Sequence, residues 1–143
     1  WCEIREGRDY LEWMYKHVSG QKPPIDIIWT NPPFSLALEF LQKSLREAST
    51  VIYLLRLSFL GSKKRRQFWQ ENPPTHLFVL SDRPTFVWVC KARTPCKRKY
   101  PVGYDQPCEC GARVGPGSDN SEYAWYCWDR GGRIRADQWL TVL

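Results

Sequence analysis

Long hydrophobic runs are absent from this sequence of 143 residues. No stretch approaches the roughly 20 consecutive apolar residues that a helix needs to cross a bilayer, and the chain does not open on the pattern of a secretory signal. We therefore expect no membrane span and a cytoplasmic location. Histidine is scarce as well, with His17 and His76 as its two members. Neither is paired with a nucleophile in a pattern typical of covalent catalysis, so we assign them no catalytic role.

The composition is that of one domain with a moderately basic surface. Hydrophobic residues make up 43% of the chain and aromatic residues 15%, which is enough to fill a core. Lys and Arg number 21 against 15 Asp and Glu, so the formal net charge is +6. This balance favours anionic partners but identifies none, because many basic proteins bind no nucleic acid.

Apolar patterns predict strands that alternate with helices in the first half of the chain. Short β-rich runs predict the strands, and apolar side chains at Ala37, Phe40, Leu41 and Leu45 predict a helix. Later strands follow one another without helices. Together these patterns predict an α/β fold with a mostly parallel sheet and an antiparallel edge. Residues 90–118, rich in Cys, Gly, Pro and Lys, interrupt the pattern as an insertion between two strands. The expected strands are 25–30, 51–55, 76–80 and 123–128, and the expected helices are 36–45 and 63–69.

The segment Asn31-Pro32-Pro33-Phe34 stands between the first of these strands and the first helix. Open α/β sheets bind ligands beyond the carboxyl ends of their strands, which is where this corner falls. Because the two prolines remove two backbone donors, the corner offers mainly acceptors beside the ring of Phe34. Acceptors next to a stacking ring suit a planar group that carries an NH2. Pro-Pro after Asn is also an ordinary loop breaker, and Asn72-Pro73-Pro74 is a second example in this chain.

This corner is similar to the fourth motif of amino-group methyltransferases that use S-adenosylmethionine, which reads Asn/Asp/Ser-Pro-Pro-Tyr/Phe/Trp. Apart from the Cys-rich stretch, the chain resembles the small phage and bacterial DNA adenine-N6 methyltransferases, and this implies a Rossmann-like class I methyltransferase sheet. The glycine-rich first motif of that family has no counterpart here, and the first residue is Trp1. We therefore expect residues 1–143 to be an N-terminally truncated, partial catalytic domain. The resemblance is carried by Cys2-Glu3-Ile4, Gly7 to Leu11, Ile25 to Glu39, Leu55 to Leu60, Arg65, Pro73-Pro74, Arg83 to Phe86 and Tyr123-Ala124-Trp125.

The resemblance implies methyl transfer from S-adenosylmethionine to the exocyclic N6 amine of an adenine that is flipped out of double-stranded DNA. Phe34 would stack on the base, and the Asn31 side-chain oxygen and the Pro32 carbonyl would accept hydrogen bonds from the amine. Positioning and charge placement would then do most of the catalytic work. The catalytic corner would comprise Asn31, Pro32, Pro33 and Phe34.

By the same resemblance, Glu3 would hold the ribose of the cofactor and Asp9 would border its adenine, with Asn31 next to the cofactor as well. Other planar amines, the guanine N2 of RNA or a glutamine amide, would suit the same corner. A non-catalytic nucleic-acid-binding module derived from a methyltransferase is the alternative outside the enzymes. The resemblance places the protein in the cytoplasm of a bacterial or phage-infected cell.

Four of the six cysteines, Cys90, Cys96, Cys108 and Cys110, lie within 21 residues. Four thiols on a turn-rich loop can close a tetrahedral Zn²⁺ site with Zn–S distances of about 2.3 Å. The spacing lacks the paired Cys-x2-Cys pattern, so a surface disulfide and scattered structural thiols are the alternatives. We predict a structural zinc within 90–118, since a loop without an apolar core needs a cross-link to stay ordered.

A basic run, Lys63-Lys64-Arg65-Arg66, precedes two aromatic residues, Phe68 and Trp69. Runs of charge are usually solvated surface. If the chain acts as a methyltransferase on DNA, however, these four side chains are candidates to neutralise phosphates, which would make binding dependent on salt.

Overall fold

The computed structural model describes residues 9–12, 25–92, 96, 98–117, 121–135, 137 and 139–143. The chain divides into two compact units. We call Trp1–Leu80 with Tyr123–Leu143 the sheet unit, and Ser81–Glu122 the cysteine unit. The expected insertion, 90–118, falls inside the cysteine unit.

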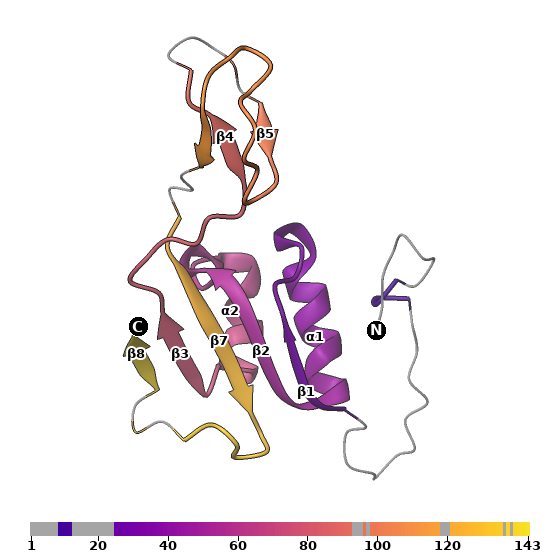
Figure 1. The fold of residues 1–143 in the computed structure, drawn as a ribbon. Helices are drawn as coiled ribbons and strands as arrows, with labels where there is room; N and C mark the ends of the chain where they lie inside the picture. The colour runs from indigo at the N-terminus through magenta and orange to yellow at the C-terminus, as the bar shows by residue number, and fades with distance from the viewer. Residues whose placement is uncertain are drawn as a thin grey trace. The chain divides into compact units, whose positions relative to one another are not determined.

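Five strands form the sheet of the first unit (Figure 1). They are β1 (Ile25–Thr30), β2 (Ala48–Arg56), β3 (His76–Val79), β7 (Tyr123–Asp129) and β8 (Leu140–Val142). Their order across the sheet is β1-β2-β7-β3-β8. β1 pairs with β2 and β3 pairs with β8 in parallel, whereas β7 is antiparallel to both of its neighbours, β2 and β3. Only β7 is therefore reversed among the strands of this sheet.

The α/β class and the mostly parallel sheet are confirmed, but the expectation of an antiparallel edge is wrong. The reversed strand, β7, lies inside the sheet between β2 and β3. Most of its residues are buried, and the pairing with β2 and β3 satisfies its backbone hydrogen-bonding groups along both edges. β3 and β7 are an antiparallel pair, and the cysteine unit is the segment of chain that joins them.

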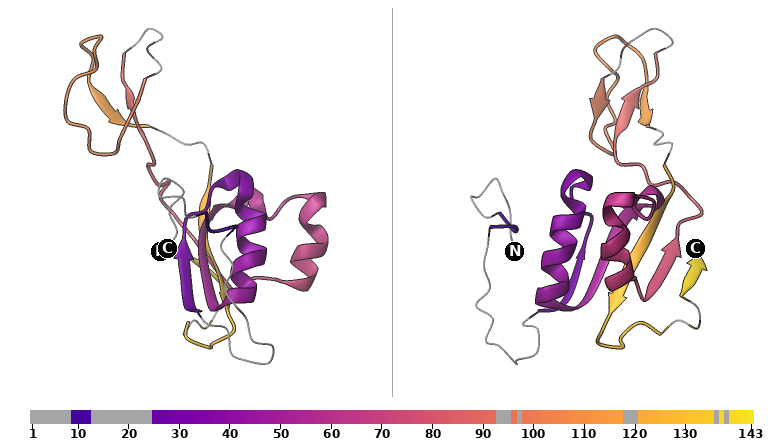
Figure 2. Two further views of the ribbon diagram at one scale, coloured as in Figure 1. Left: turned by 90° about the vertical axis from the view of Figure 1, so that its right-hand side faces the viewer. Right: turned by 180° about the vertical axis from the view of Figure 1, so that it is seen from behind.

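Two helices, α1 (Ala37–Glu47) and α2 (Arg66–Glu71), cover one face of this sheet (Figure 2). Leu41 of α1 is fully buried in the core, and the indole of Trp69 in α2 stacks on Trp128 of β7 with 6.2 Å between ring centroids. None of the helices in the described part of the chain has the length and apolar character that a membrane span requires. Short 3-10 helices are η2 (Phe34–Leu36), η3 (Leu57–Phe59) and η4 (Lys63–Arg65).

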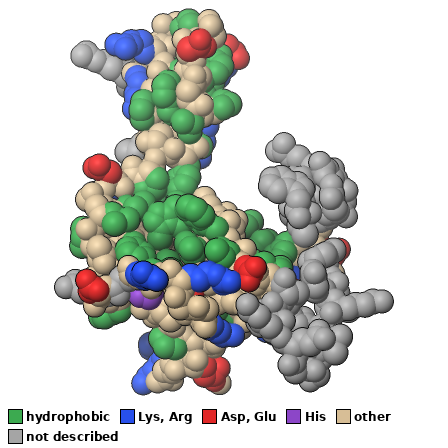
Figure 3. All heavy atoms as spheres, turned by 60° about the horizontal axis from the view of Figure 1, so that its bottom comes forward, with side chains coloured by type: hydrophobic (Ala, Val, Ile, Leu, Met, Phe, Trp, Pro, Cys, Tyr) green, Lys and Arg blue, Asp and Glu red, His purple; other side chains and the backbone are tan. Residues whose placement is uncertain are grey.

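The opposite face of the sheet carries exposed apolar side chains. Ile27 and Trp29 of β1 are 48% and 66% exposed, while Ile28 between them packs against the helix-covered core. Trp29 meets Trp125 of β7 edge to face at 5.5 Å. Figure 3 shows hydrophobic side chains gathered on one broad surface of the sheet unit, with Lys and Arg along its margin.

The cysteine unit contains a small antiparallel sheet in the order β5-β4-β6. Its strands are β4 (Trp88–Cys90), β5 (Lys99–Tyr100) and β6 (Val114–Pro116). Among the described residues of this unit, the buried hydrophobic side chains are those of Cys90 and Cys108. This unit therefore lacks an ordinary apolar core in the part that the structure describes, and its sulfur atoms occupy that place.

Candidate functional site

The corner Asn31–Phe34 lies at the carboxyl ends of two parallel strands. Asn31 directly follows β1, and β2 ends at Arg56 on the same edge of the sheet, because β1 and β2 pair in parallel. The Asn31 side chain is exposed and Phe34 is 38% exposed, so neither is lost in packing. Pro32 is buried and anchors the corner.

The backbone of the corner is closed by a short turn. The Leu36 N–H donates to the Pro33 carbonyl at 2.9 Å and begins η2. That carbonyl is therefore engaged within the turn. The acceptors that remain relevant to a ligand are the Asn31 side-chain oxygen and the Pro32 carbonyl.

Two residues to which the sequence-based prediction gave no role in the site hold the ring of Phe34. The guanidinium carbon of Arg56 lies 4.9 Å from the ring centroid of Phe34, and the Tyr123 ring lies 5.9 Å away, tilted by 42°. Arg56 Nε donates to the Tyr123 hydroxyl at 3.2 Å. Arg56 and Tyr123 are paired across β2 and β7. Arg56 could have been found from the sequence, because it is a charged residue at the end of an apolar run.

Of the two acidic residues that the resemblance assigned to the cofactor, Asp9 lies among the described residues. Glu3 lies outside the described residues. The Asp9 carboxylate accepts a hydrogen bond from the Leu11 N–H at 2.9 Å, which closes a local turn. At the corner itself, β1 is followed by two prolines, and a glycine-rich turn is absent there. The described residues therefore provide acceptors for an amine but no cradle for S-adenosylmethionine.

The basic run is divided by the structure. Lys63, Lys64 and Arg66 are exposed. Arg65 instead turns inward, where its Nε donates to the Phe59 carbonyl at 2.8 Å and its guanidinium lies 4.4 Å from the Phe59 ring. Arg65 therefore supports the chain that follows β2, unlike its three neighbours in the run.

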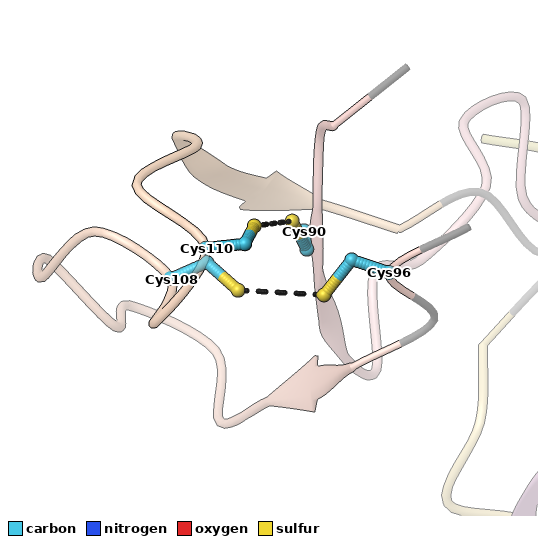
Figure 4. Close-up of side chains that lie close together, drawn as sticks. All are labelled: Cys90, Cys96, Cys108 and Cys110. Carbon is cyan, nitrogen blue, oxygen red and sulfur yellow. Dashed lines mark hydrogen bonds between the residues drawn. The ribbon is translucent and has the colours of Figure 1, made fainter. Parts of the chain in front are cut away.

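The four predicted cysteines converge in the cysteine unit (Figure 4). All four Sγ atoms lie within 4.8 Å of one another. The Sγ atoms of Cys90 and Cys110 are 3.4 Å apart, and those of Cys96 and Cys108 are 3.5 Å apart. Disulfide sulfurs lie about 2.05 Å apart, whereas sulfurs at the corners of a tetrahedron with Zn–S of about 2.3 Å lie about 3.8 Å apart. The cluster has the dimensions of a metal site and can hold a metal ion.

Backbone hydrogen bonds position these cysteines. Cys90 ends β4 and its N–H donates to the Arg98 carbonyl at 3.2 Å. The Cys108 carbonyl accepts from the Gly111 N–H at 2.7 Å, and Gly111 has a φ of +79°, which glycine adopts without strain. This tight turn brings Cys108 and Cys110 onto one site although a single residue separates them.

The environment of Cys108 favours its thiolate form. The Cys110 backbone N–H, followed by the Tyr100 hydroxyl, lowers the pKa of Cys108 to about 6. The Tyr100 hydroxyl donates to Cys108 Sγ at 3.0 Å. Since the thiolate is the form that ligates metals, these donors prepare Cys108 for that role.

No known protein family, curated protein or solved structure matches this chain. Its function is therefore inferred from its own residues.

Proposed function

We propose that this chain supplies the amine-binding corner of an S-adenosylmethionine-dependent methyltransferase that acts on the N6 amine of adenine in DNA. The observation that carries the proposal is the acceptor corner at the carboxyl ends of β1 and β2, with Asn31 exposed and Phe34 partly exposed. Ligand sites of α/β sheets occur at this edge. The order of motifs along the chain supports the choice of reaction.

In this proposal a flipped adenine stacks on the exposed part of the Phe34 ring. The Asn31 side-chain oxygen and the Pro32 carbonyl accept the two N–H groups of its amine, which aims the nitrogen lone pair away from both acceptors. Arg56 and Tyr123 hold the ring in one orientation, because they contact it from two different strands. The corner thus selects a planar NH2 group by geometry and hydrogen bonding, which are the main means of catalysis available to it.

S-adenosylmethionine, when bound, would supply the electrophilic methyl group. Because Asp9 is engaged in its own turn and two prolines follow β1, the described residues do not fit this cofactor as a complete cradle. We assign to them the binding and orientation of the amine, and no step through the cofactor.

A binding experiment tests the corner without the cofactor. We expect adenosine to shift the NMR signals of the Asn31 side chain and the Phe34 ring, and N6,N6-dimethyladenosine, which has no N–H to donate, to shift them far less. Asn31→Ala should abolish the difference between the two ligands. Asn72→Ala is the matched control, since Asn72 opens the other Asn-Pro-Pro segment, ahead of β3 and at the opposite edge of the sheet.

Equal binding of the two nucleosides to the wild-type protein would refute the amine site. Guanosine or a glutamine amide bound more tightly than adenosine would support one of the other planar amines instead. DNA binding without any preference for an amine would favour the non-catalytic module.

We also propose that the ion of the four-cysteine cluster is Zn²⁺ with a structural role. Four thiolates are soft ligands of the kind that zinc takes in closed tetrahedral sites. A site in which Cys90, Cys96, Cys108 and Cys110 all ligate leaves no open position for a substrate. The buried place of Cys90 and Cys108 in a unit with few other buried apolar groups supports a role in folding.

A further inference from the structure

A hollow of about 410 Å³ lies beside the chain that follows β2. This chain leaves the carboxyl end of β2, the edge of the sheet where the corner Asn31–Phe34 also lies. The hollow is lined by Leu60, Ser62, Lys63, Arg66, Trp69 and Gln70.

Two of the four cationic side chains in the basic run line the hollow. Lys63 and Arg66, three residues apart, both line it, whereas Lys64 is exposed elsewhere and Arg65 is turned toward the Phe59 carbonyl. The four charges of this short helical segment therefore have different surroundings. One contacts the backbone, one faces solvent and two line the hollow.

Hydrogen-bond donors dominate the polar lining. The ammonium of Lys63 and the guanidinium of Arg66 can only donate, and the Ser62 hydroxyl can donate as well. The Trp69 indole N–H has no hydrogen-bond partner among the described residues, but it is buried, so we do not count it among the donors that an anion in the hollow would meet. No carboxylate lines the hollow, and within the described chain none forms an ion pair with Lys63 or Arg66. Such a lining complements an anion with several acceptor oxygens.

We infer that this hollow binds a phosphate group of the DNA backbone. Its charge comes from Lys63 and Arg66, and its volume exceeds that of a single phosphate, which leaves room for the adjoining sugar. The choice of DNA rests on the proposed function. The anion site itself rests only on the residues of the hollow. With an acceptor corner for a base and a donor hollow for a phosphate on one edge, the sheet unit would contact two different parts of one nucleic acid.

The experiment compares three variants that each remove one positive charge: Lys63→Gln, Arg66→Gln and the control Lys64→Gln. Affinity for a short duplex DNA is measured over a range of salt concentrations. We expect Lys63→Gln and Arg66→Gln each to weaken binding about three- to tenfold and to reduce the salt slope by about 1. Lys64→Gln should change affinity by less than about twofold, because its side chain lies outside the hollow.

A second measurement reports on the hollow alone. Titration with inorganic phosphate should shift the Trp69 indole N–H signal in the NMR spectrum of the wild-type protein, and Arg66→Gln should suppress that shift. Equal losses of DNA affinity in all three variants, or an indole signal that phosphate leaves unchanged, would overturn the site. Failure of the amine test at Asn31 would leave both readouts intact, so the two proposals fail separately.

Discussion

The guanidinium of Arg56 lies over the ring of Phe34, with 4.9 Å between the guanidinium carbon and the ring centroid. The same side chain donates to the Tyr123 hydroxyl at 3.2 Å. A cation over an aromatic face contributes about 0.5–2 kcal/mol, depending on its exposure. Residues of β2 and β7 therefore orient the ring that we propose to stack on a base. The local sequence of the corner does not fix the orientation of this ring by itself.

Tyr123→Phe should loosen this arrangement without removing an aromatic ring. Loss of one hydrogen bond, worth about 1 kcal/mol, predicts a KM for a DNA substrate that rises about fivefold with little change in kcat. Tyr126→Phe is the control, since the Tyr126 hydroxyl donates to the Arg56 backbone carbonyl at 3.1 Å and does not touch Phe34. If steady-state kinetics show the same rise in KM for both variants, Tyr123 acts through stability alone.

Asn31→Ala should reduce methyl transfer at least about 100-fold, because it removes a hydrogen-bond acceptor from the reacting amine. Affinity for DNA should stay within a few-fold of the wild-type value, since phosphate contacts supply most of it. The assay uses the complete methyltransferase of which we propose that this corner is a part, and it follows label from S-adenosylmethionine into N6-methyladenine. Asn72→Ala should keep the wild-type rate, and equal losses of rate and DNA affinity in Asn31→Ala would contradict the assigned role.

Removal of the metal should unfold the cysteine unit and spare the sheet unit. The reason is that Cys90 and Cys108 are the buried hydrophobic side chains of the described part of that unit, whereas the sheet unit has its own core. Elemental analysis should find about one zinc per chain. After chelation, the NMR signal of the Trp88 indole should collapse toward that of an unfolded chain while the Trp128 signal persists.

Cysteine variants separate ligands from packing residues. Cys110→Ser should lose the zinc, and Cys127→Ser should retain it, because Cys127 is buried in β7 outside the cluster. A metal-free protein in which the Trp88 signal stays dispersed would count against the zinc proposal.

Arg65→Ala should destabilise the protein by about 1–3 kcal/mol, since it removes the bond to the Phe59 carbonyl and the contact with the Phe59 ring. Lys64→Ala should change the free energy of unfolding by less than about 0.5 kcal/mol, as expected of an exposed side chain. Urea denaturation at fixed pH and zinc concentration measures both. Comparable losses in the two variants would mean that the inward contacts of Arg65 contribute nothing.

Asp129 should make the free energy of unfolding depend on pH in the acidic range. Although burial acts to raise the pKa of Asp129, hydrogen bonds from the Ile134 N–H and the Thr50 hydroxyl hold it below its ordinary value. A carboxyl whose pKa is lower in the folded state stabilises the protein above about pH 4 and loses that contribution as the pH falls through the folded pKa. Asp129→Asn should therefore lower stability at pH 7 by about 1 kcal/mol and flatten its decline in acid.

Urea unfolding at pH 7 and at pH 3 would measure this effect. Asp26→Asn removes an exposed ion pair to Arg133 and should cost less than about 1 kcal/mol. An Asp129→Asn protein that loses stability in acid as steeply as the wild type would show that the carboxylate is not responsible.

Local patterns predicted the longer elements of the sheet unit. The run 51–55 corresponds to β2, and the helix expected at 36–45 corresponds to α1, with both ends shifted by one or two residues. The same patterns missed β8, whose side chains are mostly exposed, and the short strands β4, β5 and β6. Short strands carry too few residues for a period to stand out, and their positions depend on the cysteines that converge beside them.

The basic run shows a second limit of local patterns. Four adjacent cations look alike in the sequence, yet Arg65 binds a backbone carbonyl while Lys63 and Arg66 share a hollow. The difference arises from the path of η3 and η4 after β2, which turns one side chain inward.

The sequence by itself determined the chemistry that is available here: an Asn-Pro-Pro-Phe corner poor in donors, four thiols on one segment, and a strand content that demands an α/β sheet. Tertiary structure alone decided which groups meet. Arg56 and Tyr123 are 67 residues apart in the chain and become neighbours through the register of β2 with β7, which also places the reversed strand inside the sheet. The residue type fixes which hydrogen bonds a side chain can donate or accept. The pairing of strands that are far apart in the sequence fixes which side chains are its neighbours, because a shift of the register by one residue would turn every side chain of a strand to the other face.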